Sequence, residues 1–305
     1  MSTPTSSTSR VELPHGPVHY RDSGSGAPVV LLHGYLMGAG LWDPVVRLLS
    51  GEFRCVVPDL PFGAHPEPMR PGADLTASGL GRLVADFLEA LDLEDVTLVG
   101  NDSGTAIAQV VAARHADRLA GLVLTSGDAF DHFPPKPFRP LITAARAGML
   151  TAVLTMLKSR RARGLPTAYG WLTNGDLPHE LIDQWVAAFF GDRGVRRDLR
   201  RLTAALGDDT FMHQIAAELS GFTKPALLAW ADDDKFFPAD DARRLAGILP
   251  DARIEPIPAS RTWVMQDQPE RTAQLIAALA RRAAASRSRG SFPSSIRDTN
   301  LRHLS

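Results

Sequence analysis

The sequence predicts an α/β protein with a mostly parallel sheet, helices on both faces of that sheet, and a helical segment inserted between two of its strands. Two patterns indicate this class. Short runs of valine, isoleucine and leucine alternate with longer stretches of helical period. The alternation stops after Thr125 and resumes at Pro225, and the residues between them show helical periods and no convincing strand.

Seven strands are predicted from the short apolar runs. Several of these runs are almost entirely apolar, as expected for strands of a parallel sheet that helices cover on both faces. In chain order the predicted strands are residues 18–20, 29–32, 55–58, 96–99, 122–125, 226–230 and 254–257.

Helices are predicted where apolar residues recur every three or four positions. The helix that begins at Pro269 has this proline in its first turn, where the missing N–H is harmless. The helices predicted beside the sheet are residues 42–49, 77–91, 105–115, 240–249 and 269–284, and those of the insertion are 141–157, 181–190, 199–206 and 211–219.

These elements divide the chain into a core and a cap. The core consists of residues 11–132 and 223–284, and a helical cap consists of residues 133–222. A cap over the carboxyl ends of parallel strands places a ligand pocket between cap and sheet. Residues 1–10 are small and polar and residues 285–305 lack an apolar period, so both are predicted to be disordered tails.

Charge and composition argue against several classes of partner. The chain has 33 basic and 34 acidic residues, so no overall field attracts nucleic acid or an anionic membrane. No apolar stretch approaches the roughly 20 residues that span a bilayer, and no secretory signal is recognisable, so a cytoplasmic protein is expected. The single cysteine, Cys55, lies in a predicted strand. No metal or other cofactor is expected, and the sequence makes no prediction of oligomeric state.

The most informative segment follows the predicted strand 96–99. It reads Gly100-Asn101-Asp102-Ser103-Gly104 and leads directly into a predicted helix. In a strand–turn–helix of the type Gly-x-Asp-x-Gly, small residues permit a strained turn that exposes the central side chain beside the helix N-terminus. The exposed side chain is predicted to be Asp102. A simple helix N-cap is the alternative role for this aspartate.

Further segments occur in a matching order along the chain. They are Leu31-Leu32-His33-Gly34-Tyr35, Trp42-Asp43-Pro44, residues 57–65 and residues 230–238. With the strand–turn–helix, they make residues 14–284 resemble the α/β-hydrolase fold, and the aspartate resembles that of haloalkane dehalogenases and epoxide hydrolases. This resemblance implies that Asp102 is the nucleophile and Asp234 the acid of the triad. It also implies an oxyanion hole formed by the amides of Tyr35 and Ser103.

The resemblance breaks where the family carries its catalytic histidine. The corresponding segment is residues 258–264, with Thr262 at the place of the histidine, and the only histidine after His213 is His303. Alkylation of Asp102 then remains possible, but the usual base that activates water is missing. His65 or His132 is a candidate replacement.

Other residues are expected near the pocket. Asp128 follows the predicted strand 122–125, where some family members keep the triad acid, so Asp102, Asp128 and Asp234 could face one cavity with one carboxyl protonated near neutral pH. The alternative, given equal weight, is that Asp128 is a simple turn residue without a catalytic role. The remaining expected pocket residues are His33, which is expected to brace the oxyanion loop, His65, His132, Tyr169 and Trp263.

Recognition residues match neither subfamily. Haloalkane dehalogenases carry a tryptophan after the nucleophile, where this chain has Ser103, and epoxide hydrolases use two cap tyrosines, where this cap has only Tyr169. Tyr35 is a candidate for the second tyrosine, acting together with Tyr169.

Three functions therefore follow from the sequence. The first is hydrolysis of a small, largely apolar molecule through an Asp102 ester at a carbon–halogen or epoxide carbon. The second is a cofactor-free proton transfer, cyclisation or elimination with Asp102 as general acid or base. The third is a catalytically idle ligand-binding protein, by analogy of fold. All three imply a small-molecule partner and neither nucleic acid nor membrane.

Overall fold

The computed structural model describes residues 7–290. Eight strands form one sheet in the order β1-β2-β4-β3-β5-β6-β7-β8. β1 and β2 run antiparallel to their neighbours, and all pairs from β4 to β8 are parallel, which confirms the predicted sheet. The strands are β1 (Ser7–Leu13), β2 (Gly16–Ser23), β3 (Pro28–Leu32), β4 (Arg54–Pro58), β5 (Val96–Asp102), β6 (Leu119–Gly127), β7 (Ala226–Ala231) and β8 (Ala252–Ile257).

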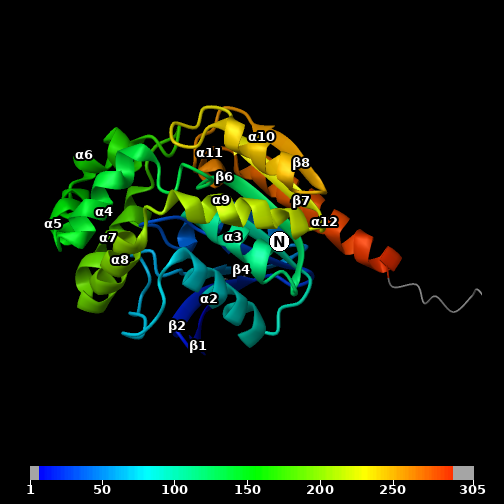
Figure 1. The fold of residues 1–305 in the computed structure, drawn as a ribbon, viewed down its shortest axis with the longest axis horizontal. Coiled ribbons are helices and arrows are strands. Elements are labelled where there is room, and N and C mark those ends of the chain that lie inside the picture. Colours follow the sequence, from blue (N-terminus) through cyan, green and yellow to red (C-terminus); the bar gives the residue numbers. More distant parts are fainter. Residues whose placement is uncertain (1–6, 291–305) are drawn as a thin grey trace, which may run out of the picture.

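Helices cover both faces of this sheet (Figure 1). The helices are α1 (Asp43–Leu49), α2 (Ala77–Ala90), α3 (Ser103–Arg114), α4 (Arg139–Arg146), α5 (Leu150–Leu154), α6 (Arg160–Arg163), α7 (His179–Gly191), α8 (Arg193–Ala205), α9 (Asp209–Glu218), α10 (Ala239–Ile248), α11 (Val264–Asp267) and α12 (Pro269–Gly290). α2, α3, α9 and α10 pack together on one face, and α1, α11 and α12 pack together on the other. Within residues 7–290, no helix combines the length and hydropathy needed to cross a membrane.

Both predicted tails are shorter than expected. Ser7–Arg10 belong to β1, where Ser7 pairs with Asp22 and Arg10 with His19. This edge strand was missed because its polar residues give no apolar run. α12 continues to Gly290, so residues 285–290 are helical rather than tail, in keeping with the high helix propensity of the alanines and arginines that precede them. Residues 1–6 and 291–305, the rest of the predicted tails, lie outside the described part.

The segment between β6 and β7 is helical, as predicted. We call residues 133–222 the helical insertion; α4 to α8 gather at one end of the molecule (Figure 1). The single helix predicted for residues 141–157 was wrong, because Gly148 at φ +74° ends α4 and a second helix starts at Leu150. The last helix of the insertion, α9, runs back along α3 and packs on the core.

The central strand β5 positions the site. All of its residues are buried between β3 and β6, and it ends at Asp102 on the carboxyl edge of the sheet. The following helix α3 starts immediately at Ser103 and passes close to β3. A Cβ at Gly104 would lie 2.6 Å from the Leu32 carbonyl oxygen, so only glycine lets the helix and strand approach this closely.

We therefore expect Gly104→Ala to destabilise the protein. Its methyl group would meet backbone atoms that cannot move without shifting β3, and such overpacking lowers the free energy of unfolding by about 1–3 kcal/mol. Urea denaturation measures this change. Gly51→Ala is the matched control, because a Cβ there meets nothing within 4 Å. A Gly104→Ala variant as stable as the control would contradict the close approach.

Candidate active site

Asp102 lies in a strained turn between β5 and α3. Its backbone has φ +54° and ψ −128°, a conformation that a residue with a Cβ seldom adopts. The neighbouring glycines allow this turn, since a Cβ at Gly100 would lie 2.5 Å from the Gly104 carbonyl oxygen. The turn predicted from Gly-x-Asp-x-Gly is therefore present, with the aspartate side chain at the sheet edge.

Two backbone amides hold one oxygen of this carboxylate. Asp102 Oδ1 accepts hydrogen bonds from Ser103 N at 2.6 Å and from Tyr35 N at 3.1 Å. Gly34 makes this approach possible, because a Cβ there would lie 2.3 Å from the same oxygen. These are the amides predicted to form the oxyanion hole. In the structure they stabilise negative charge on the Asp102 side chain itself, and they oppose the rise in its pKa that burial causes.

A cavity of about 110 Å³ lies between this sheet edge and the helical insertion. Its walls are mostly leucine, methionine, proline and phenylalanine. Among the residues that line it in the described chain, none is histidine, lysine or arginine. The polar lining residues are Tyr35, Asp102, Ser103, Asp128, Thr167, Tyr169 and Thr203.

Asp128 shares the cavity with Asp102. Its main chain is fixed, because its N–H donates to the Asp102 carbonyl oxygen at 3.2 Å and its own carbonyl oxygen accepts from Gln109 Nε2 at 2.9 Å. The side chain is 2% exposed, and Oδ1 has no hydrogen-bond partner within residues 7–290. Burial raises the pKa of Asp128 well above the ordinary value, the charge of Asp102 raises it further, and hydrogen bonding by the Ser103 side chain opposes the rise. Of the two carboxyl groups, Asp128 therefore has the more strongly raised pKa and holds its proton more firmly.

Asp234 and Thr262 form a pair beside the cavity. Asp234 Oδ1 accepts from the amides of Phe236 and Phe237 at 2.8 and 2.9 Å, and Oδ2 accepts from Thr262 Oγ1 at 3.0 Å. The Thr262 carbonyl oxygen accepts from Asn101 Nδ2 at 2.7 Å. Because a threonine hydroxyl does not titrate near neutral pH, this pair holds the loop in place but supplies no base. Neither side chain is among those lining the cavity.

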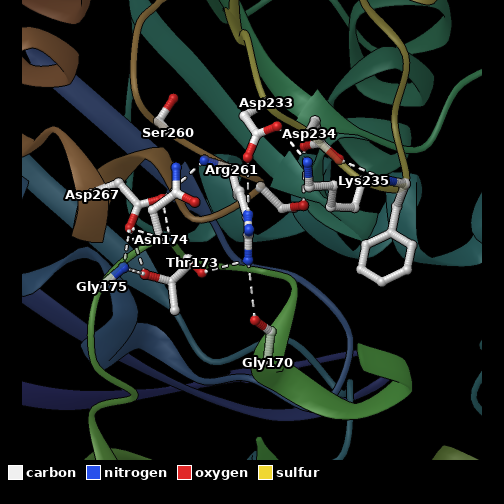
Figure 2. A network of polar contacts seen from close by, with 12 residues as sticks. Gly170, Thr173, Asn174, Gly175, Asp233, Asp234, Lys235, Ser260, Arg261 and Asp267 are labelled. Carbon is white, nitrogen blue, oxygen red and sulfur yellow. Dashed lines mark hydrogen bonds and ion pairs between the residues drawn. The ribbon is translucent and has the colours of Figure 1, made fainter. Parts of the chain in front are cut away.

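Arg261 anchors the same loop to the helical insertion (Figure 2). Its guanidinium group donates to the carbonyl oxygens of Gly170 and Thr173 at 3.3 and 3.2 Å and pairs with Asp233 at 3.3 Å. Asp267 completes the network by accepting from Arg261 N at 2.8 Å and from Thr173 Oγ1 at 2.5 Å. This network was not predicted, because its members lie far apart in the sequence and share no local motif.

The three predicted pocket histidines lie outside the cavity. His33 braces the loop before Tyr35, with Nδ1 2.9 Å from the Gly34 carbonyl oxygen and Nε2 accepting from Leu60 N at 2.9 Å. His65 is buried with Nε2 3.5 Å from Asp198, and His132 Nδ1 is 2.6 Å from Asp241. Neither His65 nor His132 is among the residues that line the cavity, so the structure does not place the predicted replacement base beside Asp102. Sequence position gave no information on which way either ring points.

Tyr35 and Tyr169 line the cavity, but their hydroxyl groups already donate hydrogen bonds within the protein. Tyr169 donates to the Leu36 carbonyl oxygen at 2.9 Å. Thr203 donates its only hydroxyl proton to the Leu199 carbonyl oxygen at 2.7 Å, so Tyr35, 2.6 Å from Thr203 Oγ1, is the donor of that pair.

Trp263, the last predicted pocket residue, is buried behind the wall. Its ring contacts those of Tyr169 and Trp185, and its Nε1 lies 3.3 Å from Met37 Sδ. It supports Tyr169 without being one of the cavity-lining residues.

A mostly parallel sheet with an aspartate at its strand–helix turn and helices inserted over the carboxyl edge is the arrangement of an α/β-hydrolase. The family model described as the alpha/beta hydrolase fold matches residues 27–267, and the chain belongs to this family.

Two curated relatives match most of the chain. Haloalkane dehalogenase 2 of Mycobacterium tuberculosis is 28% identical over 281 residues, which is 86% of this chain and 90% of that protein. The cis-3-alkyl-4-alkyloxetan-2-one decarboxylase of Shewanella oneidensis is 26% identical over 259 residues, covering 82% of this chain and 80% of that protein. A solved haloalkane dehalogenase from Bradyrhizobium elkani superposes with a TM-score of 0.75 at 21% identity, covering 92% of this chain and 100% of that one, and shows the shared fold.

The protonated state of Asp128 predicts a pH-dependent stability. Above about pH 3.9, the ordinary aspartate pKa, the unfolded chain loses this proton while the native protein keeps it, so the free energy of unfolding falls as pH rises toward the native pKa. Asp128→Asn should remove the Asp128 share of this decline, and at pH values above the native pKa of Asp128 the variant should be more stable than wild type by about 1.4 kcal/mol for each unit by which that pKa is raised. Urea denaturation between about pH 5 and pH 8 tests it. Asp240→Asn, an exposed carboxylate, is the control, and parallel curves for wild type and Asp128→Asn would contradict the assignment.

The Arg261 network predicts a local loss of stability. Arg261→Ala removes charged hydrogen bonds to the insertion and should lower the free energy of unfolding by about 1.5–3 kcal/mol. Hydrogen exchange should also accelerate at the amides of residues 170–175. Arg253→Ala, an exposed arginine on β8, should change stability by no more than about 0.5 kcal/mol. Unchanged exchange at residues 170–175 would show that other contacts hold the insertion.

Proposed function

We propose that this α/β-hydrolase is an enzyme in which Asp102 attacks an sp³ carbon of a small, largely apolar molecule and the resulting ester is then hydrolysed. One observation carries the proposal. The amides of Ser103 and Tyr35 both bond Oδ1, at 2.6 and 3.1 Å, so the carboxylate is oriented with Oδ2 as the nucleophilic oxygen.

The same two amides serve the second step. When water attacks the Asp102 ester, negative charge develops on the carbonyl oxygen, which is the oxygen that the amides already bond. An sp³ carbon is the fitting target, because attack on a carboxylic ester would produce a reactive anhydride. The apolar walls of the cavity favour an apolar substrate body.

The leaving group is proposed to be an oxygen, as in an epoxide, rather than a halide. A departing halide needs N–H or O–H donors around it, and the family's halide-holding tryptophan is replaced by Ser103. The hydroxyl protons of Tyr35 and Tyr169 are directed at Thr203 and at the Leu36 carbonyl oxygen, so they are available neither to a halide nor to an opening epoxide. The carboxyl group of Asp128 lines the same cavity, and a leaving oxygen needs the proton that such a group can give, whereas a halide does not. The relatives named haloalkane dehalogenases support attack at carbon.

A reaction that consumes no water is the second candidate. It is favoured by the absence of histidine from the described residues that line the cavity, because without it the family's usual activation of water is missing. One relative carries the name of an oxetanone decarboxylase, which denotes release of carbon dioxide. Asp102 would then act as a general acid or base without forming an ester.

Intact-mass spectrometry with epoxyhexane and bromohexane tests the nucleophile. We expect an adduct on Asp102, resolved by peptide mapping, and release of hexanediol from the epoxide. Asp102→Asn should lose the adduct and reduce product formation by at least about 10³-fold. Asp131→Asn, whose exposed carboxylate pairs with His213 at 2.8 Å, should behave like wild type.

The other outcomes separate the alternatives. If product forms under single-turnover conditions and no adduct appears, Asp102 acts as a general acid or base and does not form an ester. Saturable binding of unchanged ligand, with neither adduct nor product, would identify a binding protein.

A further inference from the structure

We propose that Asp128 performs both proton transfers of this reaction, giving a proton to the leaving oxygen and later accepting one from the attacking water. The proposal rests on the proposed function, in which Asp102 forms an ester with the substrate. It assigns to a second carboxyl group the acid and base roles that other α/β-hydrolases give to a histidine.

Excluding the other titratable side chains of the cavity leaves Asp128 as the group that can transfer a proton. The titratable side chains that line it in the described chain are Tyr35, Asp102, Asp128 and Tyr169. The tyrosine protons are committed to Thr203 and the Leu36 carbonyl oxygen, and Asp102 is the nucleophile. Asp128 is therefore the remaining group able to exchange a proton with substrate or water.

The geometry places Asp128 for this role. It follows β6, the strand beside β5, and its N–H bonds the Asp102 carbonyl oxygen at 3.2 Å. Its Oδ1 is buried and has no partner within residues 7–290, although such atoms are almost always bonded in folded proteins. Asp128 lines the cavity, so a small rotation of its side chain brings this unpaired oxygen to a ligand or a water there. The Ser103 side chain lowers the pKa of both Asp102 and Asp128, which indicates that it lies close to both carboxyl groups.

Formation of the ester changes the electrostatics of the pair. Before reaction, burial and the negative charge of Asp102 raise the pKa of Asp128, so its proton is retained for the leaving oxygen. Once Asp102 is a neutral ester, this repulsion is gone and the pKa of Asp128 falls. Burial still raises the pKa of Asp128, so the carboxylate left by the first proton transfer is a good base and can accept a proton from water. The proton transfer to the leaving oxygen thus prepares Asp128 for the second step.

The two steps balance. In the first, Asp102 Oδ2 bonds the epoxide carbon, the ring C–O bond breaks, and the leaving oxygen takes the proton of Asp128. In the second, water attacks the ester carbon and gives one proton to Asp128, while the charge on Oδ1 is held by the amides of Tyr35 and Ser103. As the ester C–O bond breaks, the alcohol oxygen takes the other proton of water. Asp102 returns as carboxylate, Asp128 as acid, and the sum is epoxide plus water to diol.

Two probes separate the acid role from the base role. Bromide leaves as an anion without a proton, whereas the epoxide oxygen needs one. After bromide has left, Asp128 releases its proton to bulk water before it acts as base on the ester, since the charge of Asp102 that helped to retain this proton is gone. With bromohexane, Asp128→Asn should form the Asp102 ester as wild type does but hydrolyse it about 10²–10⁴-fold more slowly, so the adduct accumulates in the intact mass. With epoxyhexane, formation of the adduct itself should slow by a similar factor. Asp131→Asn should match wild type with both probes, and circular dichroism and urea denaturation verify that each variant is folded.

The results distinguish this proposal from the one on which it rests. Hydrolysis of the bromohexane-derived ester by Asp128→Asn at the wild-type rate would overturn the base role, and epoxide opening at the wild-type rate would overturn the acid role, while leaving Asp102 as nucleophile. Absence of an adduct in wild type and Asp128→Asn, with either probe, would overturn the nucleophilic role of Asp102 and that of Asp128 with it. Asp128→Glu offers a rescue test: partial recovery of hydrolysis supports proton transfer, and a loss equal to that of Asn in a folded variant argues against it.

Discussion

The site depends on one backbone constraint, the strained conformation of Asp102 between β5 and α3. Its φ of +54° is maintained because strand, helix and two loops approach the turn too closely for any larger residue at Gly34, Gly104 or Gly127. This packing directs the Asp102 side chain away from the sheet and toward the amides of Tyr35 and Ser103. The packing of the buried sheet around the turn offsets the strain energy of this conformation. As a result, the Asp102 carboxylate has a fixed orientation.

The electrostatics of the cavity follow from that orientation. A buried carboxylate normally needs a cation, but the cavity-lining residues of the described chain include neither lysine nor arginine. Two amide dipoles at the start of α3 and on the neighbouring loop stabilise the charge of Asp102 instead. They do not extend the same stabilisation to Asp128, whose pKa is the more strongly raised of the two. Two carboxyl groups with unequal pKa values in an apolar cavity form an arrangement suited to proton exchange.

Much of the fold could be predicted because it depends on short stretches of chain. The apolar runs of β3 to β7 and the Gly-x-Asp-x-Gly turn each carry a local signal that survives in the structure. The edge strand β1 carries no such signal, since its pairing with β2 is made through backbone groups and polar residues. Gly148 ends a helix through a left-handed conformation that the apolar period of the segment does not reveal.

The sequence by itself determined which residue stands at the turn. The order of its motifs also assigned Asp234 to the place of the triad acid and Thr262 to the place of the histidine. Only the tertiary structure decided what each polar group contacts. It directed His65 and His132 to Asp198 and Asp241, away from the cavity. Among the residues that the structure describes, it also left Oδ1 of Asp128 buried with no hydrogen-bond partner. The physical reason is that a turn is specified by neighbouring residues, whereas burial, charge and the direction of a side chain are set by segments far apart in the chain.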